Sequence, residues 1–302
     1  MDSVLTIGLS PTFQKIIVFS SFRENEVNRS SEVRQVCSGK AINVSKILKK
    51  LGRESLNLLP LGGIRKNEFI SLCQKEGVNI RPLEVKAEIR TCTTIINKEK
   101  KTSTELVEES NRVEEVDSIN FFNLFLKEVD NHSAVVISGT KAPGFSSSLI
   151  PEIVRESKKR SKLVILDVKG DDLKESLKYA PDIIKPNLSE FVSTFGIKKE
   201  ISENEENTEV KEKVIEIAKN LFNQYGTKSV ITRGKYSTWV YDGSAFFTID
   251  NKNVAVVNTI GCGDTFTASL THSLLNGEKL ENAVKFASLC AQKKATHLTL
   301  DI

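Results

Sequence analysis

The stretch "KLVILDV" (Lys162–Val168) is a short apolar run with one carboxylate, Asp167, near its end. Four more runs share this continuous apolar character: "VLTIGL" (Val4–Leu9), "AVVISG" (Ala134–Gly139), "PDIIKPN" (Pro181–Asn187) and "SVITRG" (Ser229–Gly234). Because polar and apolar residues do not alternate in them, these runs are typical of parallel strands that are covered on both faces. The sequence therefore predicts a largely parallel, buried sheet.

Helical periodicity lies between or beside these runs. Three apolar stripes have the spacing of one helix face: Val44, Ile47, Leu48 and Leu51; Val214, Ile217, Ala218, Leu221 and Phe222; and Phe266, Leu270 and Leu274. Strands that alternate with helices over most of a chain predict a doubly wound α/β fold.

Two segments, residues 14–36 and 88–109, interrupt this alternation. Both are rich in β-branched residues and turn formers, which favours short antiparallel strands. One interpretation is a small β subdomain, built from two places in the chain and placed as a lid. The alternative is two ordinary hairpins at the edge of the main sheet, and the sequence does not separate the two.

Composition excludes several classes of protein. No apolar run among the 302 residues approaches the roughly 20 that a membrane span needs, and the N-terminus lacks a signal-peptide pattern. We therefore expect a cytoplasmic protein with no membrane contact.

The net charge is only +4, and basic and acidic residues are interleaved, as in Lys198–Lys213, so we expect no nucleic-acid partner. Five cysteines without a CxxC pair and three dispersed histidines predict neither a disulfide framework nor a zinc site.

Polar or glycine-bearing residues follow the predicted strands. They are Ser138-Gly139, Asp167, Lys185-Pro186-Asn187 and Thr232-Arg233-Gly234. Open parallel sheets bind ligands beyond the carboxyl ends of their strands. This edge of the sheet is therefore the predicted binding edge.

The sequence Gly261-Cys262-Gly263-Asp264 stands directly before a helical pattern. Glycines let an anion approach the backbone, and the first amides of a helix are unpaired at the positive end of its dipole. We predict an anion hole here, with Asp264 as a general base, since no histidine is placed for that role. The alternative is that Asp264 only caps the helix. A dinucleotide GxGxxG motif is excluded because Phe266 occupies its last glycine position.

Two further patterns suit phosphate chemistry. Asn187 and Glu190, three residues apart, share one face of a helical turn and suit Mg²⁺ held through water, or they form a simple capping pair. Lys40 could hold a phosphate as a point charge and Arg90 could hold one with a bidentate fork, although each could equally be a surface charge.

With these motifs together, the chain resembles the ribokinase-like (PfkB) family of carbohydrate kinases, and within it the 1-phosphofructokinase and tagatose-6-phosphate kinase branch. Eight stretches follow that branch's order over nearly the whole length: "EVNRSSEV", "GKAINV", "PLGG", "TELVEE", "VVISG", "LDVKGDDL", "IKPNLSEF" and "NTIGCGDTFTASL". The resemblance implies one ribokinase-like domain over residues 1–302, a three-layer α/β/α sandwich with a lid from about 14–36 and 88–109.

The resemblance also implies a reaction, the transfer of the ATP γ-phosphoryl group to a hydroxyl of a sugar or a sugar phosphate. Asp264 would be the base, the amides of Gly261, Cys262 and Gly263 the anion hole, and Asn187 and Glu190 the Mg²⁺ motif. Residues near the nucleotide phosphates would be Lys185, Thr232 and Gly234. Residues around the sugar phosphate would be Gln14, Gly39, Lys40, Asn43 and Arg90. A homodimer through the lid is expected as well.

Departures from the family pattern lie mainly on the sugar side. In "SPTFQ" (Ser10–Gln14), Gln14 replaces an aspartate that contacts sugar hydroxyls, so a charge-assisted bond is lost. Ala41 replaces a glycine, and Arg233 replaces an uncharged residue. We expect an active phosphotransferase for a fructose-1-phosphate or tagatose-6-phosphate type of acceptor. The alternative is a degenerate member that binds or regulates without catalysis.

Overall fold

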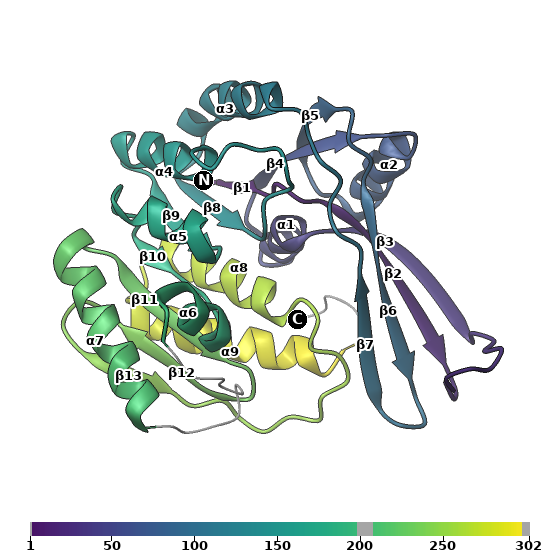
Figure 1. The fold of residues 1–302 in the computed structure, drawn as a ribbon. Helices are drawn as coiled ribbons and strands as arrows, with labels where there is room; N and C mark the ends of the chain where they lie inside the picture. Colours follow the sequence, from purple (N-terminus) through teal and green to yellow (C-terminus); the bar gives the residue numbers. More distant parts are fainter. Residues whose placement is uncertain (1, 198–207, 298–302) are drawn as a thin grey trace.

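The computed structural model describes residues 2–197 and 208–297; residues 198–207 of the charged stretch Lys198–Lys213 lie outside the described residues. Within these ranges nine strands form a large sheet (Figure 1). Their order across it is β13 (Phe246–Ile249), β12 (Tyr236–Tyr241), β11 (Lys228–Arg233), β10 (Ile183–Ile184), β9 (Leu163–Asp167), β8 (Ala134–Ser138), β1 (Val4–Ile7), β4 (Ser55–Gly62) and β5 (Ile80–Val85).

Every neighbouring pair from β11 to β5 is parallel, and only the pairs that involve β12 and β13 are antiparallel in the described sheet. The five continuous apolar runs form β1, β8, β9, β10 and β11. The predicted, mostly parallel sheet is therefore confirmed.

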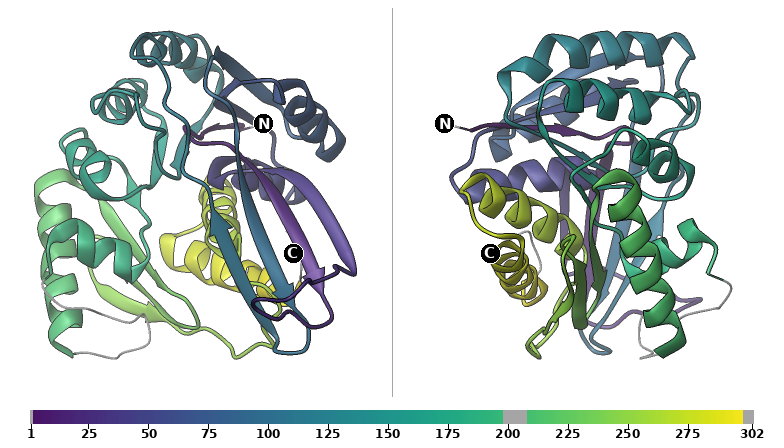
Figure 2. Two further views of the ribbon diagram at one scale, coloured as in Figure 1. Left: turned by 45° about the vertical axis from the view of Figure 1, so that its right-hand side comes forward. Right: turned by 90° about the vertical axis from the view of Figure 1, so that its left-hand side faces the viewer.

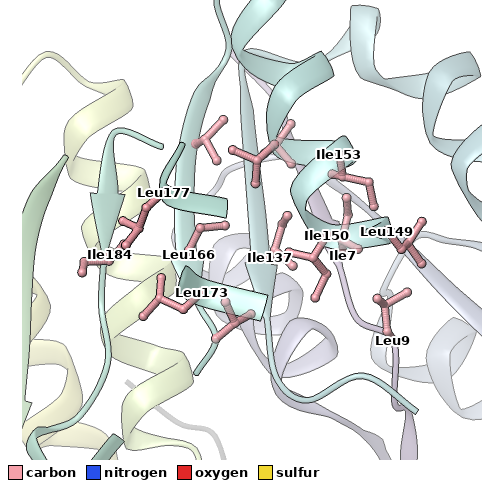
Figure 3. Packing of buried hydrophobic residues seen from close by; sticks show 14 of the residues in the cluster. Ile7, Leu9, Ile137, Leu149, Ile150, Ile153, Leu166, Leu173, Leu177 and Ile184 are labelled. Carbon is pink, nitrogen blue, oxygen red and sulfur yellow. The ribbon is translucent and has the colours of Figure 1, made fainter. Parts of the chain in front are cut away.

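Helices cover both faces of this sheet. On one face, apolar side chains pack from α3 (Val116–Glu128), α4 (Leu149–Lys159), α5 (Gly170–Leu177), α6 (Leu188–Phe195) and α7 (Thr208–Tyr225). The 3₁₀ turn η1 (Val129–Asn131) follows α3. Figure 3 shows side chains of α4 and α5 over those of β1, β8, β9 and β10.

The opposite face is covered by α1 (Lys40–Lys50), α8 (Cys262–Leu275) and α9 (Leu280–Ala295). Helix α2 (Lys66–Glu76) packs through Phe69 and Cys73 in a cluster that includes Leu59 and Leu61 of β4. The three predicted apolar stripes lie on α1, α7 and α8, so these helices are confirmed. The result is a three-layer α/β/α sandwich. No helix in the described part of the chain is long and apolar enough to cross a membrane.

Both inserted segments contribute to one small, separate sheet that projects from the side of the sandwich (Figures 1 and 2). Its order is β3 (Glu32–Ser38), β2 (Thr12–Phe19), β6 (Arg90–Asn97) and β7 (Thr102–Val107). The β2–β3 and β6–β7 pairs are antiparallel, as predicted, but β2 and β6 pair in parallel. The expectation of antiparallel strands is therefore wrong for the central pair, because the two hairpins join through strands that run in the same direction.

Candidate active site

Asp264 lies in the first turn of α8, behind Gly261, which occupies the N-cap position at a φ of 82° that favours glycine. Asp264 is not the N-cap residue but stands three positions after it, inside the helix. Its Oδ2 instead accepts a bond of 2.7 Å from Nδ2 of Asn43, which lies in the first turn of α1. Capping is therefore not the role of Asp264, and its carboxylate faces the N-terminus of α1.

Burial governs the acidity of Asp264, which is only 6% exposed. It raises the pKa of Asp264 to about 6, and the nearby Asp167 carboxylate acts in the same direction. The Lys40 and Lys185 ammonium groups and the Asn43 hydrogen bond oppose this rise. A carboxyl with a pKa near 6 is mostly ionised at pH 7 and can still accept a proton, as a general base must.

The backbone around Gly263 presents an open surface. A Cβ added at Gly263 would meet nothing within 4 Å, and Gly263 and Asp264 lie in the first helical turn, where amides lack acceptors four residues earlier. The Cys262 N–H, by contrast, donates to the Thr259 carbonyl at 3.1 Å. One of the three predicted donors from Gly261 to Gly263 is thus engaged inside the loop in this structure.

Asp167, at the end of β9, is the buried centre of a second charge cluster. Its Oδ1 lies 3.4 Å from Lys185 Nζ and 3.7 Å from Lys40 Nζ. Its Oδ2 accepts bonds from the hydroxyls of Ser138 (3.1 Å) and Thr267 (3.0 Å). Burial alone would raise the pKa of Asp167, but the Lys185 and Lys40 ammonium groups and these hydroxyls hold it below its ordinary value. Asp167 is therefore ionised at neutral pH.

Asn187 and Glu190 form a capping box at the start of α6. The Asn187 Oδ1 accepts from the Glu190 N–H at 2.8 Å, and Glu190 Oε2 accepts from the Asn187 N–H at 3.0 Å. The capping pair is thus present, but Glu190 Oε1 lies outside it, 3.5 Å from Lys40 Nζ. Capping leaves one carboxylate oxygen directed to the site.

Lys40 also lines a cavity that opens to solvent. Its empty volume is about 450 Å³ when the open solvent at its mouth is included. The lining includes Gly39, Ala41 and Arg90. The Arg90 Nη1 donates to the Glu108 carbonyl at 2.8 Å, whereas its buried Nε has no hydrogen-bond partner among the described residues. Two basic side chains, Lys40 from α1 and Arg90 from the small sheet, therefore line the same cavity.

Comparison with known proteins decides the family. A family model described as "pfkB family carbohydrate kinase" matches residues 1–300. The chain belongs to this family. Tagatose-6-phosphate kinase of Staphylococcus epidermidis strain RP62A is 26% identical to this pfkB kinase over 305 residues, which cover 99% of the chain and 95% of the relative.

Solved structures share the fold of this pfkB kinase. A possible 1-phosphofructokinase of Thermotoga maritima superposes with a TM-score of 0.87 at 22% identity, over 99% of this chain and 94% of that one. Phosphofructokinase-2 of Escherichia coli, solved with fructose-6-phosphate, gives a TM-score of 0.84 at 19% identity, over 98% and 94% of the two chains. At these identities the likeness establishes the ribokinase-like fold alone.

Most residues predicted for the phosphate end of this carbohydrate kinase lie together at the carboxyl edge of the sheet. Lys185 and Lys40 meet at Asp167, and Asn187 bridges Thr232 in a parallel pair. Gly234 follows β11 at a φ of 55°, where the chain turns into β12. Arg233 does not present its charge to solvent at this edge. It is 1% exposed, and its guanidinium lies 4.1 Å from the centre of the Trp239 ring.

Of the predicted sugar residues, Gly39, Lys40 and Arg90 line the cavity, whereas Asn43 and Gln14 do not. Asn43 is bonded to Asp264, and Gln14 lies within the small sheet. Gln14 is 6% exposed, and its Nε2 donates to the Thr94 hydroxyl at 2.8 Å within the small sheet. Ala41 does line the cavity, where it packs against Gly8: a Cβ on Gly8 would come within 2.8 Å of the Ala41 Cβ. The added methyl thus fills a space between β1 and α1.

The structure changes the interpretation of two residues, Asp167 and Cys262. Asp167 was predicted to lie at the binding edge of the sheet, but no pattern in the sequence assigned it a role in the site. A thiol at a helix N-terminus is a candidate for a lowered pKa. Burial instead raises the pKa of Cys262, so its thiol is poorly suited to oxidation.

Proposed function

We propose that this pfkB kinase transfers the γ-phosphoryl group of ATP to a hydroxyl of a sugar phosphate, of the fructose-1-phosphate or tagatose-6-phosphate type. The observation that carries the proposal is the buried Asp264 carboxylate, with a pKa of about 6, at the open N-terminus of α8. It combines a base that is ionised at neutral pH with a backbone suited to an anion. The names of the relatives support the class of acceptor.

The mechanism follows from these positions. Asp264 accepts the proton of the attacking hydroxyl, and the Asn43 bond holds the carboxylate in place. The Gly263 backbone and the ammonium groups of Lys40 and Lys185 stabilise the negative charge of the transferring group. Phosphoryl transfer asks the protein for little more than such positioning and charge stabilisation.

Mg²⁺ is expected in this family, and the residues present fit it. Glu190 Oε1 lies outside the capping box, while no three-residue cluster of His, Cys, Asp and Glu that could hold a metal occurs among the described residues. This donor set suits an ion held through waters by Glu190 and Asn187 and by the phosphates. When bound, Mg²⁺ neutralises charge on phosphate oxygens.

The acceptor's own phosphate is assigned to the cavity between the two sheets. Lys40 and Arg90 line it, and the Nε of Arg90 is an unused buried donor among the described residues. Gly39 also lines the cavity, at a φ of 119°, and the Pro11 Cα at 3.3 Å restricts the space for a Cβ there. We infer that the small sheet, whose strand β6 begins at Arg90, is a lid over the acceptor.

A kinetic screen tests the function. ATP, Mg²⁺ and a panel of hexoses and hexose phosphates are combined with the wild type, and ADP release is followed. Turnover with a hexose phosphate and weak turnover with free hexoses is the expected result. Tight binding of a sugar phosphate by calorimetry, without turnover of any acceptor, would instead support the degenerate binding protein that Gln14 suggests.

We also propose a cytoplasmic homodimer through the lid. The strand register places Val33 (52% exposed) and Leu106 (53% exposed) on the same face of its sheet, and exposed apolar surface of this kind is typical of protein interfaces. Sedimentation equilibrium should give a dimer for the wild type and a monomer for Leu106→Glu. A monomeric wild type contradicts this part of the proposal and leaves the reaction untouched.

A further inference from the structure

Lys294, in the last turn of α9, is a buried ammonium directed at backbone carbonyls. It is 1% exposed. Its Nζ donates to the Asn258 carbonyl at 3.0 Å and to the His297 carbonyl at 3.3 Å. Taking a lysine out of water costs free energy, so a charge held in this way needs compensation from its surroundings. The carbonyl dipoles at the C-terminus of α9 supply part of it.

Asn258 is the residue at which α9 holds the loop before α8. The N–H groups of Val257 and Asn258 both donate to the Ala295 carbonyl, at 2.8 and 3.1 Å. The Asn258 Oδ1 accepts from the Ile260 N–H at 3.0 Å and so shapes the turn toward Gly261. The Lys294 ammonium therefore fixes one end of a loop whose other end is the anion hole.

The charge of Lys294 also acts on the start of α8. The Cys262 Sγ lies 4.0 Å from the Asn258 carbonyl oxygen that Lys294 binds. Burial raises the pKa of Cys262, the Lys294 charge counteracts this rise, and the Asp264 carboxylate adds to it. The charge of Lys294 thus acts on the first residue of α8, next to the predicted anion hole.

We propose that Lys294 is an internal monovalent cation, which holds residues 258–263 in place and adds positive charge behind the anion hole. Lys294 is a positioning residue, since it acts through the Asn258 carbonyl. This inference rests on the proposed phosphoryl transfer. Carbonyl oxygens that bind an ammonium can also bind K⁺. Because the site is filled from within the chain, the enzyme needs no added K⁺ or NH₄⁺.

The test compares Lys294→Met, which keeps length without charge, and Lys294→Ala, which opens the carbonyl site. Lys293→Ala is the matched control, because Lys293 is the exposed neighbour on the same turn. We expect kcat to fall about 10-fold or more in both Lys294 variants, with the KM of the acceptor little changed. KCl and NH₄Cl should restore Lys294→Ala several-fold over NaCl at equal ionic strength. They should not restore Lys294→Met, whose side chain still fills the space.

A second readout does not need turnover. Alkylation of Cys262 by iodoacetamide, followed by mass spectrometry of its peptide, reports the thiolate fraction. The rate at pH 8 should fall several-fold in Lys294→Ala, recover with NH₄Cl and stay unchanged in Lys293→Ala. If no acceptor is phosphorylated, the proposed function fails while this measurement still decides the role of Lys294.

Three outcomes would overturn the inference. They are a wild type that requires K⁺, Lys294 variants that keep the wild-type kcat, and a Cys262 alkylation rate that is the same in the wild type and in Lys294→Ala. The first needs no variant, so it decides even if the substitutions prevent folding.

Discussion

Replacement of Asp264 by asparagine should make the protein more stable while it loses nearly all activity. The folded protein raises the pKa of this carboxyl from 3.8 to about 6. A group that binds its proton more tightly in the folded state destabilises that state once it is ionised. The cost is absent below about pH 4, grows between about pH 4 and 6, and is complete above that range. Two pKa units correspond to about 3 kcal/mol at pH 7.

Asparagine keeps the shape of the side chain and can still accept the Asn43 bond through its Oδ1. The pKa of about 6 already includes the attraction of the carboxylate to Lys40 and Lys185, so about 3 kcal/mol is the net gain expected when the charge is removed. Urea unfolding at pH 8 should show this gain, and at pH 4 the gain should nearly vanish. The rate constant kcat should fall about 10²–10⁴-fold, with binding of an ATP analogue retained in calorimetry.

Asp167→Asn is the matched comparison at the same site. The structure holds the pKa of Asp167 below its ordinary value, so this variant should lose stability rather than gain it. Breaking a buried charge pair typically costs about 3–5 kcal/mol, and here Lys185 would keep its charge without Asp167. If both variants shifted the urea midpoint in the same direction at pH 8, the assignment of opposite environments to the two carboxyls would be refuted.

Three further substitutions probe the site. Asn43→Leu removes a hydrogen bond to the ionised Asp264 that is worth about 1.5–3 kcal/mol. The acidic midpoint of the kcat/KM profile should therefore move from near pH 6 to about pH 7–8. An unmoved midpoint would contradict the assignment of Asp264 as the base. Arg90→Met should raise the KM for a sugar phosphate about 10-fold or more in steady-state assays and leave the KM for ATP unchanged. Gly39→Ala should lower the melting temperature by several degrees in calorimetry, because its φ of 119° is strained for alanine and the Pro11 Cα lies 3.3 Å from the new Cβ.

Much of the sandwich could be predicted from the sequence because burial on both faces leaves a direct trace, the continuous apolar run. Even β10, which has only two paired residues, Ile183 and Ile184, lies inside one of the predicted runs. The parallel β2–β6 pairing could not be predicted, because the two strands lie in separate hairpins and their relative direction depends on tertiary packing.

For the site as well, features set by local sequence could be predicted and features set by tertiary structure could not. Local motifs marked Asp264 and the Asn187–Glu190 pair, because helix starts have recognisable patterns. The bond from Asn43 to Asp264 joins residues 221 positions apart, and no spacing rule predicts it. The gathering of Lys40 and Lys185 at Asp167 likewise depends on strand order. Sequence motifs therefore identified candidate groups, and the fold determined which charges meet.

In the proposed mechanism, Lys40 connects the acceptor site to the pKa of Asp264. Its Nζ lies 3.7 Å from Asp167 Oδ1 and 3.5 Å from Glu190 Oε1, longer than the roughly 2.7–2.9 Å of a good charge-assisted bond. Both carboxylates attract this ammonium and raise its pKa, but neither makes a close hydrogen bond to it in this structure. Its charge is one of the groups that lower the pKa of Asp264, so a substrate phosphate that draws Lys40 away makes Asp264 a stronger base.

The coupling predicts a difference between two pH profiles. The acidic midpoint of kcat, which reports the enzyme–substrate complex, should lie above that of kcat/KM, which reports the free enzyme. Lys40→Gln should raise the midpoint of kcat/KM and narrow the difference, because the charge is already gone before the substrate binds. Equal midpoints in the wild type would show that Lys40 stays with Asp167 and Glu190 during turnover, and the base would then gain none of its strength from acceptor binding.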